Sequence, residues 1–236
     1  MMERRKLLYE GKSKQVYLTD DPDKVVILFK DDASAGDGAK KGTIKGKGEV
    51  NAKFTDIIFR MLEKQGGIAT HLIQPISPVE LLCKSVKIVP IELIVRNWVA
   101  GSLAKRLGRE EGTPLARVVL EHGYKSDELH DPMINEWHIL AFGFAEKKQY
   151  QRMNEIAMKV NDILVPFFDA RGVILVDFKL EFGLTTTGEL VLADEFTPDG
   201  ARLWDKATKK KLDKDRFRRD LGGIEEAYAE ILGRIQ

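Results

Sequence analysis

Three charged side chains, Asp177, Lys179 and Glu181, alternate with apolar residues in the stretch 174–183. Successive side chains of a β-strand point to opposite faces, so the alternation predicts a strand with these three charges on one face. The apolar residues expected to pack into a core on the other face are Val176, Phe178, Leu180 and Phe182. A half-exposed strand carrying a ladder of paired charges is the alternative. The wholly apolar run 173–176 favours a central strand.

A second strand is predicted at 189–195, directly after the turn 185–188. Folding the two strands into a hairpin places Asp194 near Lys179, on the face that carries Glu181. A slip of one residue would present Glu195 instead, so both registers stay open. Two carboxylates and an amine on one patch, with only oxygen ligands, suit Mg²⁺ held together with the phosphates of a nucleotide. The spacing therefore indicates a phosphate-handling centre.

The run 7–17 predicts a strand, a glycine turn and a second strand. Its Gly11-Lys12-Ser13 triplet resembles part of a P-loop, but the first P-loop glycine would fall at Lys6, and a strand follows where a P-loop needs a helix. A hairpin that brings its backbone, Lys12 and Lys14 over phosphates is one interpretation. A solvated hairpin tip is the other.

The strand predicted at 87–97 ends near Arg96 and leads through Gly101 and Ser102 into a short helix at 103–107. Free backbone N–H groups and a hydroxyl at that point, with the arginine, could bind an anion. An ordinary helix cap beside a surface arginine is the alternative. A turn after 194–200 would bring Arg202 back beside the carboxylates.

The run 30–48 is rich in glycine and lysine and predicts a mobile loop, either a lid over substrate or a linker. Helices are predicted at 49–64, 150–170 and 224–235, with Pro166 kinking or ending the second. Further strands are predicted at 25–29, 72–76 and 79–83. Residues 108–148 are the least regular part, and the basic run 206–219 is interpreted mainly as a solvated surface. The four histidines lack zinc-ligand spacing.

Composition excludes several classes of protein. The chain of 236 residues has a net charge of +1, which favours neither nucleic acid nor a membrane surface as partner. One cysteine, Cys83, excludes an intramolecular disulfide and suits a reducing compartment. No secretory signal and no apolar run long enough to cross a bilayer is seen. A soluble, cytoplasmic protein is expected.

Taken together, these segments resemble the phosphoribosylaminoimidazole-succinocarboxamide synthase (SAICAR synthetase) family of purine biosynthesis. Two signature-like segments carry the resemblance: 89–96 (VPIELIVR) followed by Ala100-Gly101-Ser102, and 175–183 (LVDFKLEFG). Shorter matches occur in the order of the family, at 9–14 (YEGKSK), 34–38 (SAGDG), 130–132 (HDP), 194–200 (DEFTPDG) and 202–205 (RLWD). The resemblance covers essentially the whole chain.

The resemblance implies an α+β fold of two lobes, related to ATP-grasp, with mostly antiparallel sheets and flanking helices. The implied division is an N-terminal β lobe with one helix at 1–83 and a C-terminal α+β lobe at 84–236, with the active site between them. The implied reaction joins carboxyaminoimidazole ribonucleotide (CAIR) to L-aspartate at the expense of ATP, giving SAICAR, ADP and phosphate, with Mg²⁺ as cofactor. The resemblance also implies a homo-oligomer, a dimer.

Residue roles follow from the resemblance alone. It assigns Glu181 and Asp194 to Mg²⁺ and places Lys179 at the reacting carboxylate, with Asp177 orienting it and Glu181 counted as catalytic. The residues assigned to ATP are Gly11, Lys12, Ser13, Lys14 and Lys125, with the segment of Lys84 and Val86 meeting adenine through its backbone. Arg96, Ser102 and Arg202 are assigned to the ribonucleotide phosphate, with Lys214 and Arg218 as further candidates. Ser34, Asp37 and Asp131 are assigned to polar groups of the substrate.

Two other functions fit parts of the pattern. Another two-lobed ATP-dependent carboxylate-amine ligase, or a small-molecule kinase, would share the fold, because a fold does not determine a reaction. A nucleotide- or RNA-binding module using the lysine-rich loops would be non-enzymatic. The balanced charge and the lack of stacking aromatic residues near the lysines disfavour it.

Overall fold

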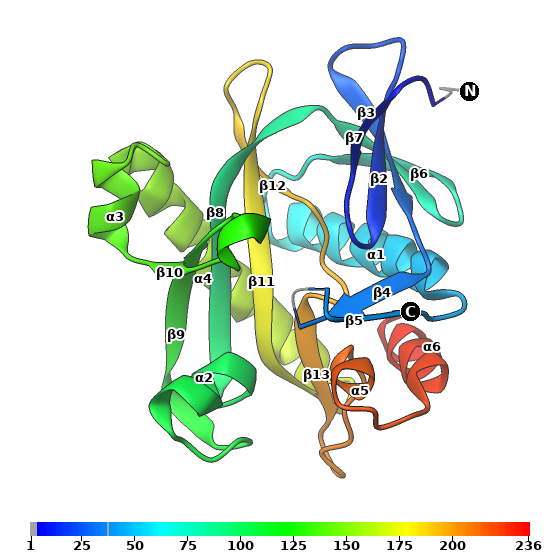
Figure 1. Cartoon of the computed structure of the whole chain (residues 1–236), viewed down its shortest axis with the longest axis vertical. Helices are drawn as coiled ribbons and strands as arrows, with labels where there is room; N and C mark the ends of the chain where they lie inside the picture. Colours follow the sequence, from blue (N-terminus) through cyan, green and yellow to red (C-terminus); the bar gives the residue numbers. More distant parts are fainter. Residues whose placement is uncertain (1–3, 37) are drawn as a thin grey trace.

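The structure is a computed structural model of the chain and describes residues 4–36 and 38–236. Five antiparallel strands from the first third of the sequence form one sheet in the order β1-β2-β3-β7-β6 (Figure 1). Their bounds are Leu7–Glu10 (β1), Lys14–Leu18 (β2), Lys24–Phe29 (β3), Leu72–Ser77 (β6) and Glu80–Lys84 (β7). The predicted hairpin around Gly11 and the three strands predicted after it are confirmed.

A second sheet is built around two long antiparallel strands, β8 (Val86–Trp98) and β11 (Val173–Thr185). The order is β10-β9-β8-β11-β12, and β13 pairs with the first half of β11. The other members are Pro114–Tyr124 (β9), Met133–Ile134 (β10), Leu190–Ala193 (β12) and Ala201–Asp205 (β13). β11 is therefore a central strand, as its apolar entry predicts, and its charged residues lie in the middle of the sheet.

Helices join and cover the two sheets. The longer ones are α1 (Lys47–Gly66), α4 (Lys147–Asp169) and α6 (Ile224–Ile235), and the short ones are α2 (Gly101–Leu107), η1 (Asp127–Leu129), α3 (Glu136–Ala141) and α5 (Asp215–Arg218). α1 packs against the first sheet and also against α4 and α6, while α4 packs on β8 and β11 (Figure 1). None of the described helices is long and apolar enough to span a bilayer.

One continuous hydrophobic core draws on both sheets and on α1, α4 and α6. Antiparallel sheets with separate helices make an α+β fold, so the predicted fold class is confirmed. The first sheet ends at Lys84 and the second begins at Val86. This change of sheet coincides with the predicted boundary between 1–83 and 84–236, but a division into two independent lobes stays a prediction.

The segment 108–148, predicted as the least regular part of the chain, contains a strand that was not predicted, β9. Its eleven residues pair with β8 on one side and β10 on the other. Most of its side chains are only half-buried or exposed, so its sequence lacks the apolar alternation that marks a strand with one buried face. The strand is stabilised instead by its backbone hydrogen bonds to the long neighbouring strand β8.

The run 30–48 is likewise more ordered than predicted. Two short strands, β4 (Asp32–Ala35) and β5 (Lys40–Thr43), form a hairpin in place of the expected mobile loop. The Asp31 carboxylate accepts hydrogen bonds from the backbone N–H groups of Gly46 (3.0 Å) and Gly48 (2.9 Å). A Cβ at Gly48 would lie 2.6 Å from the Phe29 carbonyl oxygen, so glycine permits this close approach. Here α1 begins at Lys47, two residues before the predicted start.

Two local expectations about the long elements are also corrected. A β-bulge between Leu175 and Asp177 turns Val176 away from Phe178, into a smaller cluster with Trp204. Strict alternation had placed Val176 and Phe178 on one face. In α4 the helix continues past Pro166 to Asp169, so the predicted helix is confirmed nearly to its end and only the alternative that Pro166 ends its regular part is wrong.

Candidate active site

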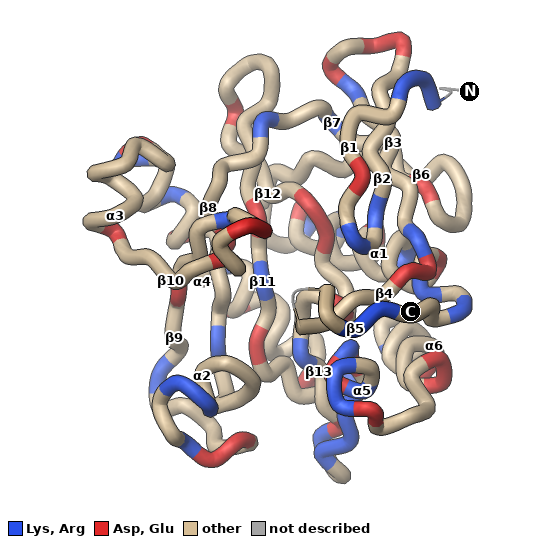
Figure 2. The backbone as a smooth tube through the Cα atoms, in the orientation of Figure 1, with Lys and Arg blue, Asp and Glu red and all other residues tan. Residues whose placement is uncertain are grey.

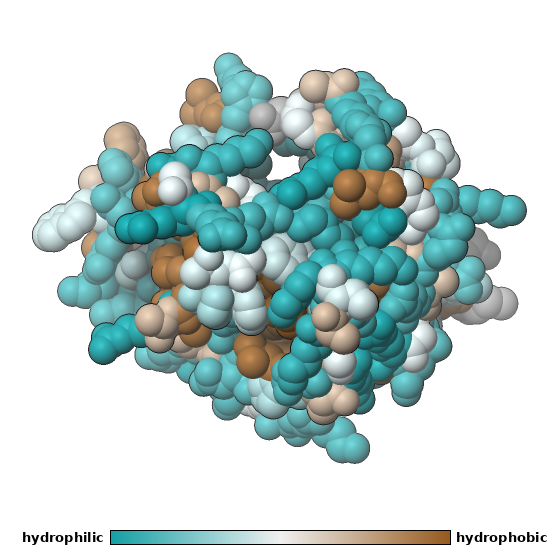
Figure 3. Space-filling model, turned by 90° about the horizontal axis from the view of Figure 1, so that it is seen from below, coloured by the Kyte–Doolittle hydropathy of each residue, from teal (hydrophilic) through white to brown (hydrophobic). Residues whose placement is uncertain are grey.

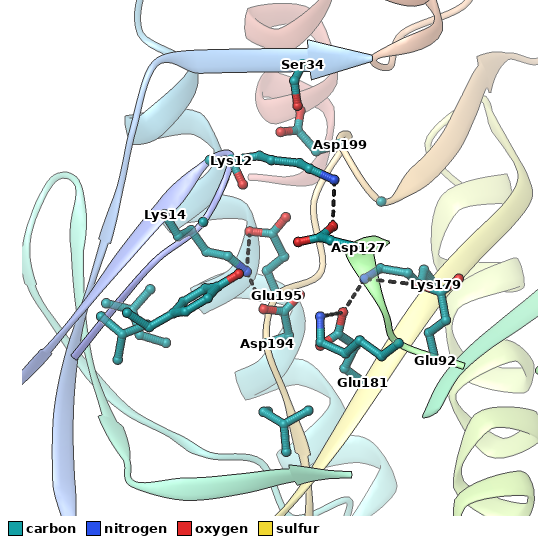
Figure 4. Close-up of a pocket in the computed structure, with 18 of the residues that line it drawn as sticks. Lys12, Lys14, Ser34, Glu92, Asp127, Lys179, Glu181, Asp194, Glu195 and Asp199 are labelled. Carbon is teal, nitrogen blue, oxygen red and sulfur yellow. Dashed lines mark hydrogen bonds and ion pairs between the residues drawn. The ribbon is translucent and has the colours of Figure 1, made fainter. Parts of the chain in front are cut away.

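A cavity of about 700 Å³ lies between the first sheet and the centre of the second. Its apolar end is formed by side chains of β2, β3 and β8: Val16, Val25, Ile27, Val86 and Ile88. Charged side chains from the β1–β2 hairpin, β11 and the segment 194–200 face its middle (Figure 4). An apolar slot next to a charged centre suits a ligand with a flat base at one end and anionic groups at the other.

Lys179 lies at the centre of the charged part. Its ammonium group donates to the Glu181 carboxylate and lies 3.6 Å from a carboxylate oxygen of Glu92 on β8. Glu92 and Glu181 are directly opposite across the two strands, so Lys179 separates two like charges. Burial lowers the pKa of Lys179, but Glu181, Asp194 and Glu92 outweigh it, and the pKa is raised overall. Lys179 is therefore held in its charged form.

Asp194 and Glu195 follow directly after β12 and face Lys14 from the hairpin. The Lys14 ammonium group donates to Asp194 and lies 3.1 Å from Oε2 of Glu195. Burial raises the pKa of Asp194, yet Lys14 and Lys179 lower it well below its ordinary value. His71 is buried with Nε2 3.1 Å from the Asp194 carbonyl oxygen.

The pairing of Glu181 with Ala193 settles the register that the sequence left open. This is the register slipped by one residue, which sets Glu195 opposite Lys179, and Glu195 lines the cavity. Asp194 lines the cavity as well, because β12 ends at Ala193 and the left-handed backbone of Asp194 turns the chain there. Arg202 returns beside β11, as expected, with Nη1 2.9 Å from Oδ2 of Asp177.

The glycine hairpin lies over the cavity in the way the phosphate interpretation requires. Lys12 donates to Asp127 on η1 at 2.7 Å, which ties the hairpin tip to the second sheet (Figure 4). Lys125 donates to Glu181 at 3.1 Å. The other predicted residues that line the cavity on these sides are Gly11, Ser13, Ser34, Lys84 and Asp131.

The three residues predicted to bind the ribonucleotide phosphate, Arg96, Ser102 and Arg202, form a second cluster outside the cavity lining. Arg96 is 2% exposed and donates to Glu121 (2.6 Å), Asp177 (2.9 Å) and Ser102 (3.0 Å). Arg202 donates to Asp177 and Asp215. Both oxygens of Asp177 serve these arginines, whereas the contacts of Lys179 go to glutamates. The expectation that Asp177 orients Lys179 is therefore wrong, because the cross-strand neighbours of Asp177 are both arginines, Arg96 on β8 and Arg202 on β13.

The last wall of the cavity contains Lys214 and Arg218, which come from the basic run 206–219. Figure 2 shows lysine and arginine gathered on this run around α5. Asp199 lies between them and the core, and accepts from the buried Lys47 at 3.0 Å. The face seen in Figure 3 is mainly hydrophilic, with hydrophobic residues in small separate groups.

The donor set fits a hard cation. Glu181 and Asp194 offer carboxylate oxygens, and Oε2 of Glu195, which lies 3.1 Å from Nζ of Lys14, is a further buried carboxylate oxygen beside them. Within residues 4–36 and 38–236, no three His, Cys, Asp or Glu side chains form a metal site by themselves. Mg²⁺ commonly takes one or two carboxylates and completes its shell with substrate phosphates and water. The two predicted carboxylates meet that requirement.

Comparisons with known proteins agree along the whole chain. The model of the SAICAR synthetase family matches residues 7–235. A phosphoribosylaminoimidazole-succinocarboxamide synthase from Coprothermobacter proteolyticus is 53% identical over 99% of both chains. The chain belongs to the SAICAR synthetase family.

Solved structures support the same assignment. The phosphoribosylaminoimidazole-succinocarboxamide synthase from Ehrlichia chaffeensis superposes with a TM-score of 0.95 and is 39% identical, over 98% of both chains. A SAICAR synthetase in complex with ADP superposes with a TM-score of 0.93 at 49% identity, over 97% of both chains. The resemblance read from the motifs is confirmed, and as a SAICAR synthetase the chain is a ligase.

Two residues of this SAICAR synthetase site were given no role in the sequence analysis, although one of them, Glu92, lies inside the matched segment 89–96. Glu92 and Asp127 line the cavity and contact Lys179 and Lys12. Glu92 was detectable, because pairing the strand 87–97 with 174–183 sets it opposite Glu181. Asp127 lies in an irregular segment and gave no such signal. Asp37 lies outside the described residues.

Proposed function

We propose that this SAICAR synthetase condenses CAIR with L-aspartate and ATP to give SAICAR, ADP and phosphate. The observation that carries the proposal is the convergence of three kinds of group on one cavity. Lysines of a glycine hairpin, two carboxylates suited to Mg²⁺, and Lys179 face one another there (Figure 4). Such a centre can place a triphosphate against an organic acid.

The chemistry explains these residue types. A carboxylate does not accept an amine, because the leaving group would be oxide. Attack of a carboxylate oxygen of CAIR on the γ-phosphorus releases ADP and forms an acyl phosphate. The aspartate amine then attacks the acyl carbon, phosphate leaves with the bridging oxygen, and the amine proton passes to solvent or a nearby base. Phosphoryl transfer of this kind depends mainly on positioning and on neutralising charge.

Each group in the cavity has a role in that scheme. Lys14, Lys12 and Lys125 neutralise the nucleotide phosphates, with Gly11 and Ser13 allowing close backbone approach. The segment of Lys84 and Val86 meets adenine through its backbone. Mg²⁺ bound by Glu181 and Asp194 would supply a further positive charge between phosphate and carboxylate.

The substrate side uses the remaining residues. Lys179, which its neighbours keep charged, faces the reacting carboxylate. Arg96, Ser102 and Arg202 bind the ribonucleotide phosphate, a role for which forked guanidinium donors are well suited. Asp177 belongs with them, since it aligns both guanidinium groups. Ser34, Asp37 and Asp131 contact other polar groups of the substrates.

The test is the dependence of ADP release on the acceptor. We expect ADP to form only when CAIR and L-aspartate are both present with ATP and Mg²⁺, together with a product whose mass equals that of SAICAR. Turnover of ATP with another carboxylate or with an alcohol acceptor, and none with CAIR, would instead identify a different ligase or a kinase. We also propose that the protein is cytoplasmic and forms a homodimer. Sedimentation of the purified protein measures its molecular mass in solution and so tests the homodimer.

A further inference from the structure

The ammonium group of Lys14 lies between the carboxylates of Asp194 and Glu195 (Figure 4). It donates a hydrogen bond to Asp194, and its Nζ lies 3.1 Å from Oε2 of Glu195 as an ion pair. Within the described residues, this Oε2 is buried and accepts no hydrogen bond. A buried charged oxygen is costly unless it is both paired and hydrogen-bonded. Oε2 of Glu195 is therefore suited to accept a hydrogen bond that Lys14 gives to Asp194 in this structure.

The two carboxylates keep Lys14 charged. Burial lowers the pKa of the ammonium group, but Asp194 and Glu195 outweigh it, and the pKa is raised overall. In the proposed function Lys14 neutralises a nucleotide phosphate while Asp194 binds Mg²⁺. A carboxylate that shares its charge with a divalent cation attracts an ammonium group less, and the two cations repel each other. Lys14 then needs its second acidic contact, which is Glu195.

A short chain of hydrogen bonds fixes the Glu195 carboxylate from behind. The Thr197 hydroxyl donates to Oε1 of Glu195 at 3.2 Å and accepts from the backbone N–H of Asp199 at 3.2 Å. Thr197 is only 1% exposed, so water does not compete for these bonds. Because one oxygen of Glu195 is held by the hydroxyl, the other is directed toward Lys14.

The far end of this chain is anchored in two helices. Oδ2 of Asp199 accepts from Lys47 on α1 at 3.0 Å, and Oδ1 accepts from the hydroxyl of Tyr228 on α6. Both partners are buried. A buried ion pair adds little net stability compared with well-packed apolar side chains, so its presence here fits a role in positioning. The segment 195–199 thus connects α1 and α6 to the ammonium group of Lys14.

We infer that Glu195 is a positioning residue, which holds Lys14 against the nucleotide phosphates while Asp194 binds the cation. Thr197 keeps Glu195 in place for this role. An ammonium group has three N–H donors, so a rotation of Lys14 about its last bond is enough to direct one of them to Oε2 of Glu195. The inference rests on the proposed function, which takes Lys14 for the phosphates and Asp194 for Mg²⁺. The motif assignments give no role to Glu195 or Thr197.

The test measures the affinity for ADP by titration calorimetry, once with saturating Mg²⁺ and once with EDTA. In Glu195→Gln the affinity in EDTA should stay within about twofold of the wild type, because Asp194 then still holds Lys14. With Mg²⁺ it should be roughly 10-fold below that of the wild type, the effect of losing one hydrogen bond between charged groups. An unchanged affinity with Mg²⁺ would overturn the inference.

A double-mutant cycle with Lys14→Met decides whether Glu195 acts through Lys14. Adding Glu195→Gln to Lys14→Met should change the affinity for ADP with Mg²⁺ by less than about twofold. If Glu195→Gln instead costs the same factor in both backgrounds, Glu195 acts on the metal itself and the inference is wrong.

Variants of Thr197 test the support of Glu195. Thr197→Val removes the hydroxyl at nearly constant volume and should lower the affinity for ADP with Mg²⁺ roughly fivefold, as expected for one neutral hydrogen bond. Thr197→Ser keeps the hydroxyl and should restore most of that affinity.

Thr55→Val is the matched control. It removes another buried hydroxyl that contacts the same segment, at the Phe196 carbonyl oxygen (3.4 Å), but that lies outside the chain leading to Glu195. It should leave the affinity for ADP unchanged, and an equal loss in Thr55→Val and Thr197→Val would overturn the role given to Thr197. Formation of SAICAR by the wild type tests the proposed function separately, because ADP binding requires neither CAIR nor aspartate.

Discussion

At the scale of single residues, Asp194 is the most informative position. Its backbone has a φ of 63°, in the left-handed region that residues with a Cβ seldom adopt. Asp and Asn tolerate this region better than other side chains, at a cost of order 1 kcal/mol. The conformation directs the carboxylate to Lys14, while the carbonyl oxygen accepts a hydrogen bond from the Nε2–H group of His71. A residue held in this way at a cavity wall is expected to act on a ligand.

The first prediction concerns the two proposed metal ligands. Glu181→Gln and Asp194→Asn should each lower the rate of SAICAR formation by roughly 10²-fold or more, since each removes a charge that holds Mg²⁺. Both replacements keep the shape of the side chain, and Asn also tolerates the left-handed backbone. Rates are measured at saturating substrates and Mg²⁺. Near-normal turnover in both variants would show that the metal binds elsewhere.

His71 gives a prediction about pH. Burial lowers its pKa to about 4 from 6.5, because a charge there would lack solvent. Between these values the unfolded chain binds a proton that the folded chain does not, so stability falls as the pH drops. From about pH 7 to about pH 5 this group alone should remove about 2 kcal/mol of unfolding free energy.

Urea unfolding of the wild type and His71→Gln at both pH values measures that contribution. Glutamine can still donate to the Asp194 carbonyl oxygen, so the comparison isolates the titration. The variant should lose about 2 kcal/mol less than the wild type over this interval. An equal loss in both proteins would mean that His71 titrates normally in the folded state.

At the scale of elements, side-chain patterns predicted β11 and its charged residues but not their surroundings. The alternation at 177–183 was sufficient because it reflects one face of a central strand. The bulge at Val176 could not be predicted, since a bulge arises from pairing with β13 and leaves no signature in local hydrophobicity. The strand β9 was missed for a related reason: its pairing with β8 is made by backbone groups, which the sequence does not display.

Arg96 on β8 pairs with Asp177 on β11, so replacing it should weaken the contact between the two strands. Arg96→Ala would remove one of the two arginines that pair with each of two mostly buried carboxylates, Asp177 and Glu121. Breaking a buried ion pair from one side typically costs about 3–5 kcal/mol, so the variant should lose about 3 kcal/mol of unfolding free energy in addition to its affinity for CAIR. Denaturant unfolding without ligands and binding of CAIR provide the two measurements.

Arg106→Ala is the matched control. Arg106 contacts the same Glu121 from a side chain that is 38% exposed, and solvent screens such pairs. Its loss should therefore cost less than about 1 kcal/mol. If the two variants were equally stable, the Arg96–Asp177 pair would not be holding the strands together.

At the scale of the whole molecule, the sequence predicted the family and most of the charged residues that line the cavity. It could not predict which distant segments support them. Asp199 depends on Lys47 from α1 and Tyr228 from α6, and this triad follows from the packing of those helices. Such contacts join residues far apart in the sequence, so only the folded structure reveals what holds the Asp199 carboxylate in place.

The position of the cavity between both sheets leads to the last prediction. A nucleotide held by the β1–β2 hairpin and by a cation on Glu181 and Asp194 would bind the folded chain and not the unfolded chain, so it should stabilise the fold. At about 100 times its dissociation constant, ADP with Mg²⁺ should add about 2.7 kcal/mol, a rise of roughly 5–10 °C in unfolding temperature for a chain of this size. Replacing Mg²⁺ by EDTA should reduce the rise, because the carboxylates then repel the phosphates.

The variant Asp194→Asn distinguishes the contribution of the metal from that of the nucleotide to the rise in unfolding temperature. Each variant is compared with its own ligand-free form, so any change in basal stability cancels. The variant should show the same rise with Mg²⁺ as with EDTA, because the carboxylate that would add the metal's contribution is gone. Asp220→Asn, a change at a side chain that is 82% exposed, should behave as the wild type. A rise in Asp194→Asn that still depends on Mg²⁺ would place the metal on other groups, and Lys14 would then have Asp194 as a structural partner only.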